Sequence, residues 1–184
     1  LSGDELTFKK GIAISDSILN EKSLKPVNGI QSSKLYYIKE FEDLNLDDFN
    51  LDMVVENKKN DQQNACPTSN ITVYCEGQVI IIPLASKGCV SEINLRVLDV
   101  LVSGKTNDLS KFGVDMNTDT SIKLSSSDGE LSIFINDILA YSVKLKEEKS
   151  PSISGIRYQF KGAGSINEII IRNKERTFLF SPSL

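Results

Sequence analysis

The chain has 184 residues, with 21 basic and 25 acidic side chains and a formal net charge of −4 at pH 7. Its basic residues form no dense cluster, because the pair at 58–59 and the segment 144–149 are mixed with acids, which argues against a nucleic-acid partner. No apolar run reaches the roughly 18 residues of a membrane-spanning helix, so we expect no membrane insertion by this segment.

Short strand patterns recur along the chain. Most are runs in which apolar and polar residues alternate, the period of a strand with one buried face, and turn residues separate them at intervals of about 8–12 residues. The first part is the least regular, and a helix at 16–25 is an alternative there. The expected strands lie at 6–9, 12–15, 35–39, 51–55, 71–75, 79–82, 93–97, 100–102, 122–124, 131–135, 139–145, 153–160, 166–172 and 177–180.

The segment from Asn64 to Ser91 contains all three cysteines and has the pattern of a β-hairpin. We expect the turn at 76–78, between an alternating strand and a β-branched one. If Cys75 pairs with Val79, facing residue numbers sum to about 154, which places Cys66 opposite Gly88. A single bulge would then bring Cys89 level with Cys66.

These positions predict which cysteines are joined. Cys75 lies at the hairpin tip, about 30 Å from Cys66 at roughly 3.3 Å per residue, whereas a disulfide needs Cα atoms within about 7 Å of each other. We therefore predict a disulfide between Cys66 and Cys89, with Cys75 a free, buried thiol. The bond would close a loop of about 24 residues, contribute roughly 3.5 kcal/mol and indicate an oxidising, extracytoplasmic compartment.

The later strands form a clear hairpin followed by another strand. Residues 131–135 alternate strictly, and Asn136-Asp137 provides a two-residue turn. The expected core face of the returning strand is Leu139, Tyr141, Val143 and Leu145. The expected core face of the following strand is Ser154, Ile156, Tyr158 and Phe160.

The number of strands predicts the fold class. If about eleven to thirteen of these fourteen segments form strands, without a long helix or an internal repeat, they indicate an all-β fold, a two-sheet antiparallel β-sandwich. Residues 1–184 fit a single domain. Because the first residue is Leu1 and not Met, we expect the chain to be excised from a longer protein. An immunoglobulin-like sandwich is the alternative.

Several short segments resemble a known superfamily. The sequences at 131–136, 153–160 and 162–169 resemble the closing strands of concanavalin A-like jelly rolls, the lectin/glucanase and laminin G-like superfamily. The Cys-Pro and Gly-Cys pairs that flank the hairpin, with the segment 108–115, resemble cell-envelope domains of this fold from gram-negative bacteria. The resemblance implies a jelly-roll sandwich outside the cytoplasm, periplasmic or on the cell surface, in a membrane-anchored parent protein.

Catalytic patterns are weak. Glycoside hydrolysis on this fold would need paired carboxylates at alternate positions of one strand, and the segments that start at Glu92 and Glu168 begin such a pattern and then depart from it. The chain has no histidine, which excludes imidazole metal ligands and leaves Cys75 without a histidine base. We therefore expect no enzymatic activity.

Two sets of residues are candidates for ligand contacts, the acids of the loops and the tyrosines. Calcium would need loop oxygens, for which solvated loop acids are the simpler interpretation, so we predict no cofactor. The acids concerned are Asp43, Asp47, Asp48, Asp108, Asp115 and Asp119. Alternation assigns Tyr141 and Tyr158 to the core and leaves three candidates for sugar contact, Tyr36, Tyr37 and Tyr74.

The sequence thus predicts a non-catalytic extracytoplasmic binding or interaction module. Its expected partner is a glycan or an envelope or extracellular protein. The first alternative is a structural spacer or assembly domain without a small ligand, favoured by the aromatic content of 7% and by an apolar edge strand at 178–180. The second alternative is a diverged glycoside hydrolase.

Overall fold

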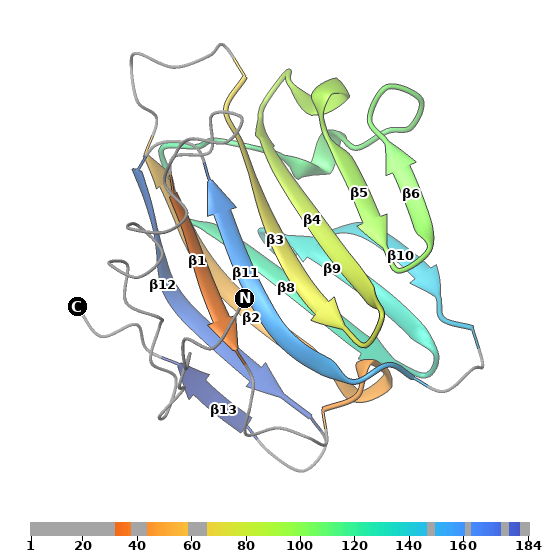
Figure 1. Ribbon diagram of the computed structural model, residues 1–184. Helices are drawn as coiled ribbons and strands as arrows, with labels where there is room; N and C mark the ends of the chain where they lie inside the picture. Colours follow the sequence, from red (N-terminus) through yellow and green to blue (C-terminus); the bar gives the residue numbers. More distant parts are fainter. Residues whose placement is uncertain are drawn as a thin grey trace.

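The computed structural model describes residues 32–37, 44–58, 66–146, 150–160, 163–173 and 177–180. The strands expected at 6–9 and 12–15, and the alternative helix at 16–25, lie outside these residues. Two β-sheets pack face to face (Figure 1), and the helices of the described part are short 3-10 turns. The predicted all-β sandwich is confirmed.

In the described part of the chain, sheet 1 has seven strands in the order β1-β11-β3-β4-β5-β6, with β7 paired to β4. All of its pairings are antiparallel except that of β7 with β4. Its strands are β1 (Ser32–Tyr37), β3 (Thr68–Cys75), β4 (Gln78–Ser86), β5 (Asn94–Val97), β6 (Val100–Ser103), β7 (Gly113–Val114) and β11 (Ile153–Phe160).

Sheet 2 has six described strands, all antiparallel, in the order β10-β9-β8-β2-β12-β13. They are β2 (Asn50–Lys58), β8 (Thr120–Ser127), β9 (Glu130–Ile135), β10 (Ile138–Lys144), β12 (Ala163–Arg172) and β13 (Thr177–Phe180). The chain crosses between the sheets after β1, β2, β7, β10 and β11, which gives the jelly-roll arrangement of concanavalin A-like domains. The immunoglobulin-like alternative has about seven to nine strands in total, fewer than are present here.

The core lies between the two sheets. It extends to one end of the sandwich, where the segment before β2 contributes to it. Inward-facing positions are apolar and buried, and Tyr158, Phe49 and Phe112 are among the largest fully buried side chains. Each such side chain stabilises the fold by roughly 1.5–3 kcal/mol. The segment before β2 adds the buried side chains of Leu44 and Leu46. Its 3-10 turn η1 (Leu46–Asp48) is tied to the segment before β11 by a hydrogen bond from the Leu46 amide to the Pro151 carbonyl, 3.0 Å.

The β3–β4 hairpin differs by one residue from the expected register. Cys75 pairs with Gln78 and not with Val79, because the turn contains only Glu76 and Gly77, and Gly77 has a positive φ of 70°. Facing residue numbers therefore sum to 153, since Thr68 faces Ala85. The outer end of the ladder consequently places Cys66 level with Lys87 rather than with Gly88.

A tight turn, not a bulge, brings the cysteines together. The Cys89 amide donates to the Ser86 carbonyl at 2.9 Å, and Gly88 between them has a positive φ of 89°. Cys66 and Cys89 form a disulfide across this turn, with their Cα atoms 5.5 Å apart. Cys75 is a buried free thiol.

Two bulges change faces that simple alternation assigned to the core. In β10 the register shifts between Leu139 and Tyr141, so Leu139 is 43% exposed rather than buried. In β11 the register shifts after Ile153, and Ser154 is exposed, where its hydroxyl donates to the Tyr74 carbonyl. One extra residue in a strand moves the side chains before it away from the face that alternation assigns to them.

Candidate functional site

Several turns meet at the end of the sandwich opposite the disulfide, at the lower right of Figure 1. They are the β3–β4 turn Glu76-Gly77, the β5–β6 turn Leu98-Asp99 and the β8–β9 turn Asp128-Gly129. Together with η1 and the end of β10, they surround a cleft of about 510 Å³. This volume is within the range of roughly 300–1,000 Å³ found for small-molecule sites.

The cleft has a mixed lining of apolar and charged side chains. The apolar residues are Leu46, Val97, Leu98, Val100, Val143, Leu145 and Pro151. The charged residues are Asp47, Glu76, Asp99, Lys144 and Lys146. Gln78 and Ser150 add polar groups. Such a lining can contact an apolar surface and form hydrogen bonds with the same ligand.

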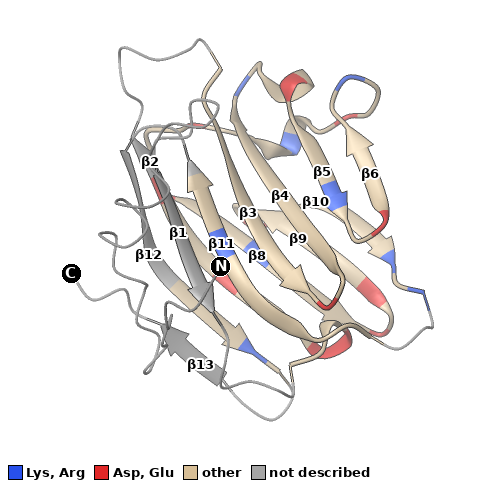
Figure 2. Cartoon of the chain, viewed as in Figure 1, with Lys and Arg blue, Asp and Glu red and all other residues tan. Residues whose placement is uncertain are grey.

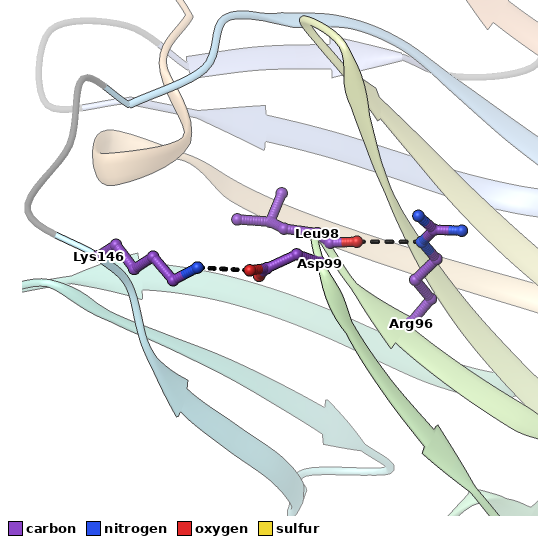
Figure 3. Close-up of polar contacts among 4 residues, drawn as sticks. All are labelled: Arg96, Leu98, Asp99 and Lys146. Atoms are coloured by element: carbon purple, nitrogen blue, oxygen red, sulfur yellow. Dashed lines mark hydrogen bonds and ion pairs between the residues drawn. The ribbon is translucent and has the colours of Figure 1, made fainter.

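An ion pair joins the two sheets beside the cleft. Lys146 Nζ lies 2.5 Å from an Oδ of Asp99, which connects the end of β10 with the β5–β6 turn (Figure 3). The hydrogen bond and the charge of Lys146 lower the pKa of Asp99 below its ordinary value of 3.8. Since both side chains are more than half exposed, the pair contributes little to stability, and its position makes it available to a ligand.

Hydrogen bonds hold the other walls of the cleft in place. The Asp47 amide donates to the Ser150 hydroxyl at 2.7 Å, and the Leu145 amide donates to the Gly129 carbonyl at 2.7 Å. The Glu76 amide donates to the Ser152 carbonyl at 2.9 Å. Because these contacts hold the described walls in place, the cleft is preformed there, and little ordering of those walls would be needed on binding.

Leu98 has an unusual backbone conformation beside the cleft. Its φ is +55°, whereas Asp99 does not have a positive φ, a combination that fits a type II′ turn, where glycine is ordinarily preferred at the first position. A leucine in this region is strained by roughly 1–2 kcal/mol. The Leu98 carbonyl accepts a hydrogen bond of 3.0 Å from Nε of Arg96 (Figure 3), so this strained residue also positions an arginine.

The cysteines lie away from the cleft. The Cys66–Cys89 disulfide is at the far end of the β3–β4 ladder from the Glu76-Gly77 turn. Burial raises the pKa of Cys75 to about 12, so its thiol is protonated at neutral pH and is a poor nucleophile.

The loop acids considered for calcium are not brought together. Among the described residues, no group of three or more histidine, cysteine or acidic side chains is arranged to hold a metal ion, and Asp43 lies outside those residues. Asp108 accepts a hydrogen bond from the Ser110 amide at 2.9 Å, and Asp115 accepts one from the Asn117 amide at 3.0 Å. These two acids therefore stabilise turns of their own segments.

The tyrosines are divided between the core and the surface. Tyr158 is fully buried and Tyr141 is half-buried against the core, as alternation predicted. Tyr74 is half-buried and pairs with Val79 on the outer side of sheet 1. Tyr36 and Tyr37 belong to β1, whose side chains are outside the described part.

Sequence reasoning missed the cleft. Its walls come from turns far apart in the chain, and Asp99 and Lys146 are separated by 47 positions. The short turns were visible as local patterns, but no local pattern shows which turns meet.

Among the helices that the structure describes, none has the length and apolar character needed to span a membrane.

Comparisons with known proteins do not assign the chain to a family. No protein-family model matches the chain, and no curated protein matches it. Galectin LEC-6 from Caenorhabditis elegans is 12% identical, with 76% of this chain and 89% of that chain covered and a TM-score of 0.45. An alginate lyase from Corynebacterium sp. is 10% identical, with coverages of 78% and 69% and a TM-score of 0.45.

A sialidase from Trypanosoma rangeli is 16% identical, with a TM-score of 0.45, and its alignment covers 85% of this chain but 25% of that chain. The chain thus spans about a quarter of the sialidase. At these identities the similarity concerns the fold alone. The strand order of the structure itself makes the protein a two-sheet jelly-roll domain, with a cleft at one end.

Proposed function

We propose that this protein is a non-catalytic extracytoplasmic binding module that takes a glycan in the cleft between the two sheets. The observation that carries the proposal is the preformed cleft of about 510 Å³ with its mixed lining. A sugar ring presents apolar C–H groups on its faces and hydroxyl groups at its edge. Apolar side chains such as Val143 and Leu145 can contact the C–H groups. Carboxylates such as Asp47 and Asp99 can accept hydrogen bonds from the hydroxyl groups.

The disulfide supports the compartment in this proposal. Disulfides persist in oxidising environments and are rare in the cytosol, and the Cys66–Cys89 bond joins the two ends of one hairpin. A protein outside the cytoplasm can also reach the polysaccharides of the cell envelope and of the environment. We further propose that the domain belongs to a longer envelope protein that is anchored in a membrane.

The ionisation of Asp99 suits a role in binding rather than the role of a glycosidase acid. A glycosidase acid must remain protonated near neutral pH, so its pKa is raised. The pKa of Asp99 is lowered instead, because Lys146 is hydrogen-bonded to it. A carboxylate that is ionised and paired accepts hydrogen bonds from hydroxyl groups but does not protonate a leaving group.

A glycan array probed with the intact 184-residue chain tests the proposal, followed by calorimetric titration of each glycan that binds. Asp99→Asn and Asp47→Asn should each weaken the affinity about tenfold, because each removes a charged hydrogen-bond acceptor. Asp137→Asn, an exposed turn residue at the other end of β10, is the matched control. An array without hits, or hits that the two cleft variants leave unchanged, would refute a glycan-binding cleft.

A specific observation also favours a second candidate function, an assembly domain. Among the described residues, the exposed large hydrophobic side chains lie on the edge strands β6 and β10, and Leu101 is 68% exposed. On β10, a bulge and a hydrogen bond from Lys111 Nζ to the Leu139 carbonyl obstruct pairing with another strand. If β6 pairs with a second copy, sedimentation should show a concentration-dependent dimer that Leu101→Lys dissociates.

A further inference from the structure

Charged residues are divided unevenly between strands and turns in sheet 1. Its strands contain no aspartate or glutamate, although acids outnumber bases in the whole chain. The acids of this region lie in the connections, with Glu76 and Asp99 in turns and Glu92 in a 3-10 turn. In Figure 2, blue segments interrupt the described strands of this sheet, and red segments lie at their turns. Sheet 1 is thus locally cationic in an acidic protein.

Two arginines lie in one row on the outer face of this sheet. Arg157 on β11 pairs with Thr72 on β3, which pairs with Ile81 on β4. Ile81 in turn pairs with Arg96 on β5. Directly paired residues point to the same face, and the alternate positions Ile71, Ile80 and Leu95 are buried in the core. Both arginines therefore lie on the face that points away from the core, about 14 Å apart at roughly 4.8 Å per strand.

Neither arginine is neutralised by an acid of the described part of the chain. Arg96 is exposed, and its contact there is the hydrogen bond from Nε to the Leu98 carbonyl. This bond fixes the guanidinium and leaves its two terminal nitrogens on the side away from Asp99 (Figure 3). Arg157 is half-buried and forms no ion pair with a described residue. Two guanidinium groups on one face, neither paired with an acid of the described residues, are ready to bind anions.

The groups beside the arginines can form hydrogen bonds with a polar ligand. Gln159 on β11 pairs with Asn70 on β3, one row along from Arg157 and Thr72, and both amides are partly exposed. Side-chain amides both donate and accept, as sugar hydroxyls require. Protein interfaces are usually anchored by a central cluster of aromatic or apolar side chains, whereas the two residues between the arginines in this row are buried Thr72 and half-buried Ile81.

We infer that the outer face of sheet 1 is a second binding site, separate from the cleft, for an anionic glycan whose chain lies across the strands from β11 to β5. Arg96 and Arg157 would each bind a carboxylate or sulfate group, since the guanidinium fork matches the geometry of both anions. Asn70 and Gln159 would bind hydroxyl groups of the intervening sugars.

Calorimetric titration of the intact chain tests this inference with four polymers. Polygalacturonate carries carboxylates, dextran sulfate carries sulfates, dextran is neutral, and polyglutamate is an anionic peptide. We expect binding to polygalacturonate or dextran sulfate, and the stronger of the two identifies the anion. We expect no measurable binding to dextran, and at least tenfold weaker binding to polyglutamate, which lacks hydroxyl groups for Asn70 and Gln159.

Variants then locate the site. Arg96→Gln and Arg157→Gln should each weaken the affinity about tenfold, the loss expected for one charged hydrogen-bonding contact. Lys123→Gln is the matched control, because Lys123 is an exposed cation on β8 of the opposite sheet, and it should change the affinity less than twofold. Arg96→Lys and Arg157→Lys keep the charge without the fork, so their affinities should fall between those of the wild type and the glutamine variants.

Three results would overturn the inference. The first is the absence of binding to both anionic polysaccharides, and the second is equal affinity for polyglutamate, which would indicate an acidic protein as the partner. The third is an effect of Arg96→Gln no larger than that of Lys123→Gln. Since Arg96 is exposed, melting curves of its variant should match the wild type even if Arg157→Gln folds poorly. The cleft proposal is tested on other residues, so the two can fail separately.

Discussion

At the scale of single residues, Ser126 combines burial with an unsatisfied polar group. Its side chain faces the core from β8 and is 4% exposed, and its hydroxyl has no hydrogen-bond partner among the described residues. The next residue, Ser125, is different, because its hydroxyl donates to Asn50 Oδ1 at 2.6 Å. Two adjacent serines therefore have opposite contributions to stability.

Replacement of these serines should change stability in opposite directions. Ser126→Ala should stabilise the protein by about 1 kcal/mol, because it removes a buried hydroxyl that is desolvated without compensation. Ser125→Ala, the matched control, should destabilise it by about 1 kcal/mol through loss of the bond to Asn50. Urea denaturation of both variants measures the two free energies of unfolding, and a destabilising Ser126→Ala would contradict the assignment.

Cys75 should be chemically silent in the folded protein. Burial raises its pKa to about 12, so at pH 8 only about one thiol in ten thousand is ionised, and the thiolate is the reactive form. A thiol reagent should leave the native protein unmodified and should modify one thiol per chain after denaturation without reductant. After reduction of the disulfide, three thiols should react. Rapid modification of the native protein would show that Cys75 is accessible.

At the scale of elements, the disulfide stabilises the β3–β4 hairpin. It links Cys66, just before β3, with Cys89, which follows the turn after β4. The cross-link closes a loop of 23 residues in sequence separation and restricts the unfolded chain more than the folded one. The chain-entropy model gives a stabilisation of roughly 3.5 kcal/mol for such a loop.

The double variant Cys66→Ser, Cys89→Ser should therefore be less stable by roughly 3 kcal/mol. Guanidinium denaturation of the variant and of the wild type, each with and without reductant, measures this difference. Reductant should bring the wild type close to the variant and leave the variant unchanged. If wild type and variant unfold at the same denaturant concentration without reductant, the disulfide does not stabilise the fold.

The elements also show where local patterns were sufficient. The turn at Asn136-Asp137 was predicted from its residue types, and both residues have the positive φ that such a turn requires. The bulges near Leu139 and Ser154 were not predicted, because a bulge depends on the partner strand rather than on the strand's own alternation. The one-residue error at Cys75 had the same origin, since three turn residues were expected where two occur.

At the scale of the whole molecule, the Asp99–Lys146 pair connects the two sheets, and its effect should depend on pH. The folded state lowers the pKa of Asp99 below 3.8, so ionisation is favoured by folding. The stabilisation is therefore present above the ordinary carboxyl pKa and is lost as the pH falls through the lowered value. It is small, because both groups are exposed.

Melting temperatures measured between pH 7 and pH 2 check this dependence. Asp99→Asn should melt slightly below the wild type at pH 7, and the difference should vanish at the acid end of the range. Lys146→Met should show the same trend, because it removes the other member of the pair. A difference that grows on acidification would mean that the protonated carboxyl is the favoured form, opposite to the direction inferred from the structure.

The sequence by itself determined the fold class, most strand positions, the cysteine pairing and the buried position of Tyr158, because alternation, turn chemistry and the reach of a hairpin are local properties. Only the tertiary structure decided which strands are neighbours. It placed β11 beside β3 and thereby set Arg157 in one row with Arg96. It also brought the distant turns together around the cleft. Both candidate sites depend on contacts between segments far apart in the chain, which the local pattern of residues does not encode.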